Sequence, residues 1–291
     1  MTVPKPLIAK TGKEQFRVSA TANWADKCAS VQVYSVTPEG KKLIDHASCE
    51  VKFFDCAAAE LEWKRSSYLV KRSIQLLEDN ALKGGAHRLQ RGMVYKLFSA
   101  LVDYDENYQS IREVILDSEN HEATAFVKFQ APQDNFHRNP YWIDSFGHLS
   151  GFIMNASDTT DSKNQVFVNH GWDSMRCLKK FSPDVTYRTH VRMQPWRDSI
   201  WAGDVHIFDG DDVIAVYGGV KARHTPMNLI DSWPLTLANS SKLCHDESWI
   251  LLFHQQAPQR REARRCSSLQ PPRSLCKRKI QMPAGQSLQW P

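Results

Sequence analysis

An aspartate and a histidine stand four residues apart in the stretch from Asn139 to Phe152. Asp144 and His148 belong to a segment with helical spacing of apolar residues, and side chains at positions i and i+4 share one helix face. The two side chains can therefore point into one cavity. A carboxyl and an imidazole in one cavity could carry proton-transfer chemistry, because histidine titrates near neutral pH and an apolar pocket can keep a carboxyl protonated.

Both residues also have plain structural explanations. Asp144 can cap the N-terminus of the helix that the spacing predicts over residues 145–155, because a carboxylate accepts hydrogen bonds from the first free backbone N–H groups. His148 can be a pocket-lining or core histidine that is bonded to the backbone. Gly147 and Gly151 lie four residues apart in this segment, and they predict very close packing of the helix against a sheet.

The bulk composition is that of a globular protein. The chain has 291 residues, of which 42% are hydrophobic and 24% charged, and no apolar run approaches the roughly 18 residues that cross a bilayer. The N-terminus lacks the apolar core of a secretory signal, so we expect a cytoplasmic protein with no membrane role. The seven cysteines are scattered without a CxxC pair or zinc spacing, so we expect no disulfide, no metal site and no cofactor.

The net charge of +5 comes from the C-terminal part of the chain. Residues 232–291 hold nine Lys/Arg and three Asp/Glu, whereas the remaining residues are nearly balanced in charge. A balanced body argues against nucleic acid as a partner of the folded part. Gln, Arg, Ser and Pro dominate residues 232–291 without any period, so we predict a disordered, low-complexity basic tail.

Alternating and helical patterns predict a mixed α and β protein. Polar and apolar residues alternate in segments that predict strands at 15–21, 30–36, 43–54, 111–116, 123–129, 166–168, 185–193, 200–208 and 213–220. Helical spacing runs across 66–102, where Gly84-Gly85 ends the first part, and again over 145–155.

The order of these elements predicts two unequal units. A helix wrapped by a curved antiparallel sheet is the hot-dog unit, and the later part of the chain has this order of helix and strands. The earlier part has the strands without the helix. We therefore predict an α+β double hot-dog in which residues 1–135 form a first unit that lacks its N-terminal strand and helix. Residues 136–231 form the second unit, and residues 232–291 form the tail.

Several motifs in a fixed order resemble the product-template domain of fungal non-reducing polyketide synthases, a domain related to dehydratases. The resemblance covers residues 5–231 and rests on the segments 5–10, 85–89, 93–98, 140–145, 151–155, 168–172, 203–205 and 218–221. It implies a dehydratase-like double hot-dog that directs regiospecific aldol cyclisation and dehydration of a poly-β-keto chain in fungal aromatic polyketide biosynthesis. The implied partners are an acyl carrier protein, which tethers that chain through phosphopantetheine, and other polyketide synthase subunits.

The resemblance also assigns roles to single residues. The catalytic pair of the family is a histidine from the first hot-dog unit and an aspartate from the second, and Asp144 corresponds to that aspartate. Asn169 corresponds to a polar residue that helps to hold a water or a substrate oxygen. From the sequence alone, Asn169 can equally satisfy local backbone groups.

One departure from the family concerns the catalytic base. The family histidine lies in a His-x-Val-x-Gly-like motif before the Lys-Pro-Leu-Ile-Ala segment, which starts here at Lys5, so we expect an N-terminally truncated member without it. His148 could take its place, or bind substrate or water. Three possibilities stay open at this point: an active cyclase, an inactive truncated or split synthase fragment, and a non-catalytic hot-dog that binds an acyl chain.

Overall fold

Two antiparallel sheets carry most of the structure. The computed structural model describes residues 1–5 and 15–226, so the predicted tail lies outside the described residues. The first sheet has three strands in the order β1-β2-β3, with bounds β1 (Phe16–Asn23), β2 (Cys28–Val36) and β3 (Lys42–Lys52). Its register places Val18 beside Val33 and Val33 beside Ala47. One face of this sheet is therefore apolar, as the alternation in the sequence predicts.

The second sheet has nine strands. Its main path runs β4-β5-β6-β9-β11-β12-β7, with β10 paired to β11 and β8 paired to β12. The strands are β4 (His87–Gln90), β5 (Ile111–Asp117), β6 (Glu122–Val127), β7 (Gln165–Gly171), β8 (Ser174–Cys177), β9 (Tyr187–Arg192), β10 (Gln194–Arg197), β11 (Ile200–Asp209) and β12 (Asp212–Pro226). The helices are α1 (Cys56–Leu82), α2 (Arg91–Phe98), the 3₁₀ helix η1 (Glu106–Tyr108) and α3 (Pro140–Asn155).

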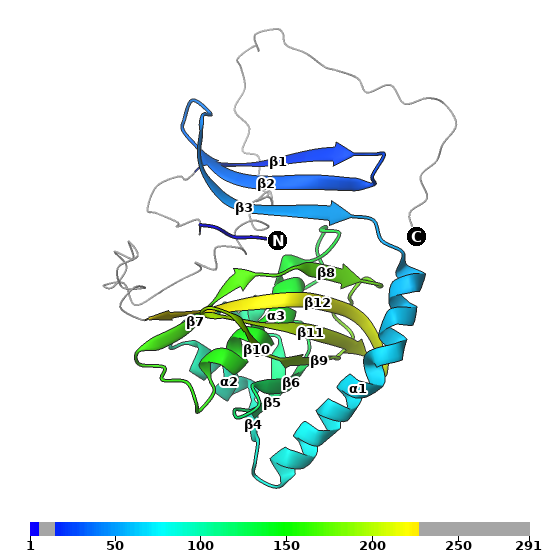
Figure 1. Cartoon of the computed structure of the whole chain (residues 1–291), viewed down its shortest axis with the longest axis vertical. Coiled ribbons are helices and arrows are strands. Elements are labelled where there is room, and N and C mark those ends of the chain that lie inside the picture. The colour runs from blue at the N-terminus through cyan, green and yellow to red at the C-terminus, as the bar shows by residue number, and fades with distance from the viewer. Residues whose placement is uncertain (6–14, 227–291) are drawn as a thin grey trace, which may run out of the picture. The chain divides into compact units, whose positions relative to one another are not determined.

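The two faces of the nine-stranded sheet pack against different helices (Figure 1). On β11, Val205 and Ile207 belong to the main core cluster together with Phe146 of α3. Phe208, the next residue of the same strand, belongs to a second cluster with Trp63 of α1. Neighbouring residues of a strand point to opposite faces, so α3 lies against one face and α1 against the other. A helix packed into an antiparallel sheet is the arrangement that the sequence predicts for the second hot-dog unit.

Strand pairing continues across the predicted boundary between the units. The sequence places this boundary after residue 135, yet β4, β5 and β6 belong to the same sheet as the strands that follow it. Phe126 of β6, for example, pairs with Arg188 of β9. The strands on the two sides of residue 135 thus form one continuous sheet, and the division at residue 135 stays a prediction. Thr2 links the two sheets, because it forms β-bridges to both Ser48 and Gly171.

The first long helix begins earlier than the pattern predicts. Asp55 caps α1, and its Oδ1 accepts hydrogen bonds from the backbone N–H groups of Ala57 and Ala58. The alanines that follow favour a helix without giving apolar periodicity, so a search for periodic residues finds only the part after residue 66. The short strand β4 separates α1 from α2, which corrects the expectation of helical structure across 66–102.

Gly151 does not pack as closely as the sequence predicts. A Cβ atom added to this residue of α3 would meet no atom within 4 Å outside the local helix backbone. By contrast, a Cβ on Gly203 would collide with the carbonyl oxygen of Arg192. A close backbone approach therefore occurs at Gly203, between β9 and β11.

This difference generates a first prediction. Gly151→Ala should raise the free energy of unfolding by about 0.5–1 kcal/mol, because alanine favours the helix and finds free space there. Gly203→Ala is the matched control. It should lower the free energy of unfolding, because the new methyl group would collide with the backbone of Arg192 and force it to move. Urea unfolding followed by circular dichroism measures both. A destabilised Gly151→Ala protein would contradict the packing described here.

A buried acid and two histidines lie on the α1 side of the sheet. His190 on β9 and Glu122 on β6 are joined by a hydrogen bond of 2.7 Å between Nε2 and Oε1. Burial opposes ionisation of Glu122, but the hydrogen bond and the charge of His190 outweigh it and lower the pKa of this carboxyl. Burial, assisted by the nearby charge of His190, lowers the pKa of His206 on β11. The folded protein therefore favours ionised Glu122 and neutral His206.

Both shifts predict that acid destabilises the fold. The contribution of His206 should be fully present above its ordinary pKa of 6.5 and should be lost as the pH falls toward its lower folded value. The contribution of Glu122 should be lost at lower pH, from its ordinary value of 4.5 downwards. Urea unfolding across pH 4–8 measures the effect. In His206→Asn the decline just below pH 6.5 should flatten, and an unchanged decline would contradict this assignment.

Candidate active site

The helix that carries the candidate pair begins at Pro140. Asn139 is its N-cap residue, and its Oδ1 accepts hydrogen bonds from the backbone N–H groups of Tyr141 at 2.9 Å and Trp142 at 3.4 Å. Pro140 suits the first helical position, because the missing N–H group has no partner there in any helix. The expectation that Asp144 caps this helix is therefore wrong. Asp144 lies in the second turn, so its side chain is available for another role.

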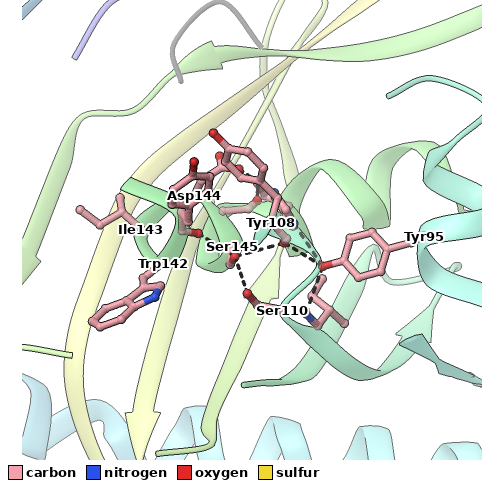
Figure 2. Close-up of polar contacts among 12 residues, drawn as sticks. Tyr95, Tyr108, Ser110, Trp142, Ile143, Asp144 and Ser145 are labelled. Carbon is pink, nitrogen blue, oxygen red and sulfur yellow. Dashed lines mark hydrogen bonds and ion pairs between the residues drawn. The ribbon is translucent and has the colours of Figure 1, made fainter. Parts of the chain in front are cut away.

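Asp144 and His148 are in direct contact, as the i, i+4 spacing predicts. Nε2 of His148 lies 2.7 Å from Oδ2 of Asp144, and the side chains are only 1% and 2% exposed, respectively. Asp144 belongs to α3 and is buried in the interior (Figure 2). A carboxyl and an imidazole that share a hydrogen bond away from water can exchange a proton, because the low local dielectric strengthens their interaction.

Aromatic rings enclose His148. The ring of Tyr104 lies 4.1 Å from the imidazole, centroid to centroid, and those of Phe98 and Tyr95 lie at 5.8 and 6.2 Å. Tyr95 and Phe98 come from α2, so the two helices meet around this histidine. The rings restrict rotation of the imidazole and so hold Nε2 towards the carboxyl of Asp144.

The hydroxyl of Tyr95 is the centre of a second set of contacts. It accepts a hydrogen bond of 3.0 Å from the backbone N–H of Ile111, and its proton faces the carbonyl oxygen of Tyr108 at 3.2 Å and Nδ1 of His148 at 3.5 Å. Burial raises the pKa of Tyr95 well above its usual range. The phenol is therefore neutral and remains a donor beside the imidazole.

Ser145 connects α3 to the segment before β5. Its Oγ donates towards the carbonyl oxygen of Tyr141, 2.7 Å away, and lies 2.9 Å from Oγ of Ser110 (Figure 2). Both serines are fully buried. Sequence reasoning missed Tyr95, Ser110 and Ser145 as parts of the site. For Tyr95 a signal was available, because it lies in the 93–98 segment that carries the family resemblance.

Asn169 lies on β7, where its contact is local. Its Oδ1 accepts a hydrogen bond of 2.8 Å from the backbone N–H of Gly171, as the structural explanation of this residue anticipates. Its role in binding water or substrate stays a prediction. Asn155, which the sequence did not single out, holds α3 to β7: it donates to the carbonyl of Phe167 at 3.0 Å and accepts from the N–H of Phe167 at 2.9 Å.

A cleft of about 410 Å³ lies elsewhere, on the opposite face of the sheet from α3. Its lining residues alternate along β9 and β11 with core residues such as Val191 and Val205. It is lined by Asp173, His190, Arg192, Gln194, Trp196, Ala202, Gly203, Asp204, His206 and Gly219. The Asp144–His148 pair belongs to the other face, so we assign the candidate chemistry to the buried pair and not to this cleft.

Within residues 1–5 and 15–226, no group of three or more His, Cys, Asp or Glu side chains is placed to hold a metal ion. Cys28, Cys49, Cys56 and Cys177 are free thiols. No helix in the described part of the chain combines the length and the apolar character that crossing a membrane requires.

Comparison with known proteins identifies the family to which the chain is similar. Residues 76–223 match the family described as polyketide synthase dehydratase N-terminal domain. Over 231 residues the chain is 83% identical to the conidial yellow pigment biosynthesis polyketide synthase of Emericella nidulans, a match that covers 79% of this chain and 11% of that protein. Over 232 residues it is 72% identical to the conidial pigment polyketide synthase alb1 of Aspergillus fumigatus, covering 80% and 11%. The chain thus spans only about a ninth of these relatives.

Solved dehydratase domains share the fold at low sequence identity. The dehydratase domain from the CurJ module of curacin polyketide synthase aligns with a TM-score of 0.57 and 16% identity, over 79% of this chain and 75% of that one. The dehydratase domain of RzxB from Pseudomonas fluorescens aligns with a TM-score of 0.52 and 13% identity, over 76% and 73%. With the α3-filled antiparallel sheet, these matches confirm the dehydratase-like, α+β hot-dog fold that the sequence predicts.

The contacts of Tyr95 generate a prediction about stability. Tyr95→Phe should lower the free energy of unfolding by about 1–3 kcal/mol, because the buried N–H of Ile111 loses its acceptor. The exposed Tyr68 of α1 supplies a matched control, and Tyr68→Phe should change stability by less than about 0.5 kcal/mol. Thermal and urea unfolding measure both variants. Equal effects would show that the Tyr95 hydroxyl does not support the fold.

Proposed function

Because the chain belongs to the polyketide synthase dehydratase family, we propose that it directs the cyclisation of a poly-β-keto chain in fungal aromatic polyketide biosynthesis. The relatives are fungal polyketide synthases, several of them named for conidial pigment, and residues 76–223 match a dehydratase family. The proposed reaction is a product-template-like aldol cyclisation followed by loss of water. The single observation that carries it is the buried hydrogen bond between Asp144 and His148.

The reaction needs one base and one acid. The base removes a proton from a CH₂ group between two carbonyls, and the resulting enolate carbon attacks another carbonyl carbon of the same chain. The oxygen of that carbonyl takes up a proton and becomes a hydroxyl. Loss of water then requires a proton on the departing hydroxyl and removal of a neighbouring C–H proton. Acid and base groups that act in such steps contribute roughly 10²–10⁴-fold each.

Asp144 is the proposed acid. Its carboxyl is buried, and in its protonated form it could donate to a carbonyl or hydroxyl oxygen of the substrate. His148 holds this carboxyl in one orientation through the 2.7 Å contact. The same contact favours a second task for His148, which is to return a proton to Oδ2 after each transfer. The base in the first step is either His148 or a group supplied by a partner.

The substrate and partners follow from this chemistry. A poly-β-keto chain is reactive and flexible, so a pocket must hold it in one register while it cyclises. We propose that it arrives as a thioester on the phosphopantetheine of an acyl carrier protein, and that further polyketide synthase subunits complete the assembly. The matched part is 11% of the Emericella nidulans relative, which leaves most of such a synthase to supply these partners. Asn169 is the proposed ligand of a water or a substrate oxygen.

Asp144→Asn tests the proposed acid. The variant should lower the rate of formation of the cyclised product by roughly 10²–10⁴-fold, because asparagine cannot donate the carboxyl proton. The assay supplies the chain with a carrier-bound poly-β-keto thioester and identifies products by mass spectrometry and absorbance. His148→Gln, which can still hold the Asp144 carboxyl by a hydrogen bond, should retain more activity than His148→Leu.

Binding of the carrier separates the alternatives. If the wild-type protein binds the loaded carrier but forms no product, and Asp144→Asn binds equally well, the chain is a non-catalytic acyl-binding module. If it neither binds nor turns over, it is an inactive fragment of a synthase. Either result would overturn the proposed function, whereas product formation that depends on Asp144 would support it.

A further inference from the structure

The outer face of α1 carries an unusual stripe of side chains. Five large apolar residues of this helix are more than half exposed. One is Leu82 at 82%, the last residue of the helix, and the other four are Leu61 at 54%, Tyr68 at 64%, Leu69 at 53% and Leu76 at 58%. Two arginines, Arg65 and Arg72, are exposed between them. At about 100° of rotation per residue, these four residues and the two arginines fall within an arc of about 100°. We call these residues the α1 stripe: Leu61, Arg65, Tyr68, Leu69, Arg72 and Leu76.

The α1 stripe is not needed to attach the helix to the rest of the protein. The opposite side of α1 does this, because Ala59, Trp63, Ile74 and Leu77 are buried and pack in clusters with residues of the nine-stranded sheet. Ion pairs from Arg176 to Glu62 and from Arg188 to Glu78 add to this attachment. The helix is thus fixed along the sheet (Figure 1), with the α1 stripe on its outer side.

The two arginines of the α1 stripe retain their charge for an outside partner. Nearby Lys64 is paired with Glu60, and Lys71 is paired with Asp211. The ion pairs of the described residues include neither Arg65 nor Arg72. They are seven residues apart, which is about 10.5 Å along the helix axis. A partner that covers the apolar residues would therefore meet two positive charges at a fixed separation.

Charge argues against a second copy of this chain as the occupant. An antiparallel pair of α1 helices that covers the whole α1 stripe would place Leu61 opposite Leu76 of the other copy. The same register places Arg65 opposite Arg72, because both residue pairs are centred between positions 68 and 69. Like charges in direct opposition are unfavourable. The α1 stripe is self-complementary in shape but not in charge.

We propose that the α1 stripe is a docking surface for an acidic amphipathic helix of a protein partner. The partner helix presents apolar side chains to Tyr68 and Leu69, and carboxylates seven residues apart to Arg65 and Arg72. Its pattern is Glu-x-x-Leu-Leu-x-x-Glu or a chemical equivalent. Arginine, tyrosine and leucine pack well in such helix-on-helix contacts, where burial supplies affinity and the charges set register. This inference concerns assembly and does not depend on the chemistry of Asp144.

A protein helix fits the α1 stripe better than a lipid surface does. Membrane-bound amphipathic helices present a wide apolar face and place their cations on the polar side. Here the cations lie inside a narrow apolar stripe, and the other side of the helix is already held against the sheet. A partner helix that lies along α1 can reach both the leucines and the arginines.

Two synthetic peptides test the proposal on the full chain. One fluorescein-labelled helical peptide carries two Glu-x-x-Leu-Leu-x-x-Glu repeats, and its control carries Lys in place of Glu. We expect the Glu peptide to bind, as measured by fluorescence anisotropy, and the Lys peptide to bind at least about tenfold more weakly, since two exposed charge pairs change sign. The double variant Arg65→Glu, Arg72→Glu should reverse this preference. Leu69→Ala should weaken binding of either peptide.

Control variants and competing outcomes make the test decisive. Lys64→Glu changes an exposed charge next to the stripe and should leave the preference between the two peptides in place. Circular dichroism of each variant checks that α1 stays folded. The proposal would be overturned if both peptides bound equally well, or if neither bound at about millimolar concentration. Binding of the protein to anionic vesicles that the double variant Arg65→Glu, Arg72→Glu abolishes would point to a lipid surface instead and would overturn it too. A concentration-dependent dimer that Leu69→Glu dissociates would overturn it in favour of a second copy of the chain.

Discussion

The hydrogen bond between Asp144 and His148 is made inside the protein, and its burial constrains the structure around it. Removing a carboxyl and an imidazole from water is costly unless each keeps a polar partner. The two residues meet that need for each other because they lie one helical turn apart on α3. Aromatic rings from α2 and from the segment after it fill the remaining space around His148. The architecture thus keeps water away from a polar pair without separating its members.

The same constraint explains why α3 differs from a surface helix. Most of its residues are buried, including polar ones such as Ser145 and Ser150. A helix that is buried on nearly all sides must satisfy its polar side chains within the protein. Ser145 and Ser150 do so by bonding to carbonyls of the preceding turn, and Ser145 also reaches Ser110. The antiparallel sheet supplies the apolar surface that encloses the rest.

The periodic spacing of apolar residues predicted those features of the structure that depend on neighbouring residues along the chain. It placed β5, β11 and the shared helix face of Asp144 and His148 well, because each follows from a repeat of two or 3.6 residues. It misplaced the start of α3, where Asn139 and not Asp144 is the cap, since either residue type can accept the same hydrogen bonds. The contact of Tyr95 with His148 crosses more than fifty positions, and no local pattern can show it. The pairing of β6 with β9 is hidden from local patterns for the same reason, because the two strands are far apart in the sequence.

The pairing of β6 with β9 has a consequence for the order in which the molecule assembles. β1, β2 and β3 are joined by short turns, so they can come together soon after they are synthesised. β6 and β9 are separated by the whole segment that contains α3, and closing such a loop costs conformational entropy before any contact compensates for it. The interior around α3 is complete only when this distant strand arrives. A nascent chain therefore acquires its first sheet early and the interior around Asp144 last, and a mutation that slows the late step delays burial of that side chain while leaving the early meander intact.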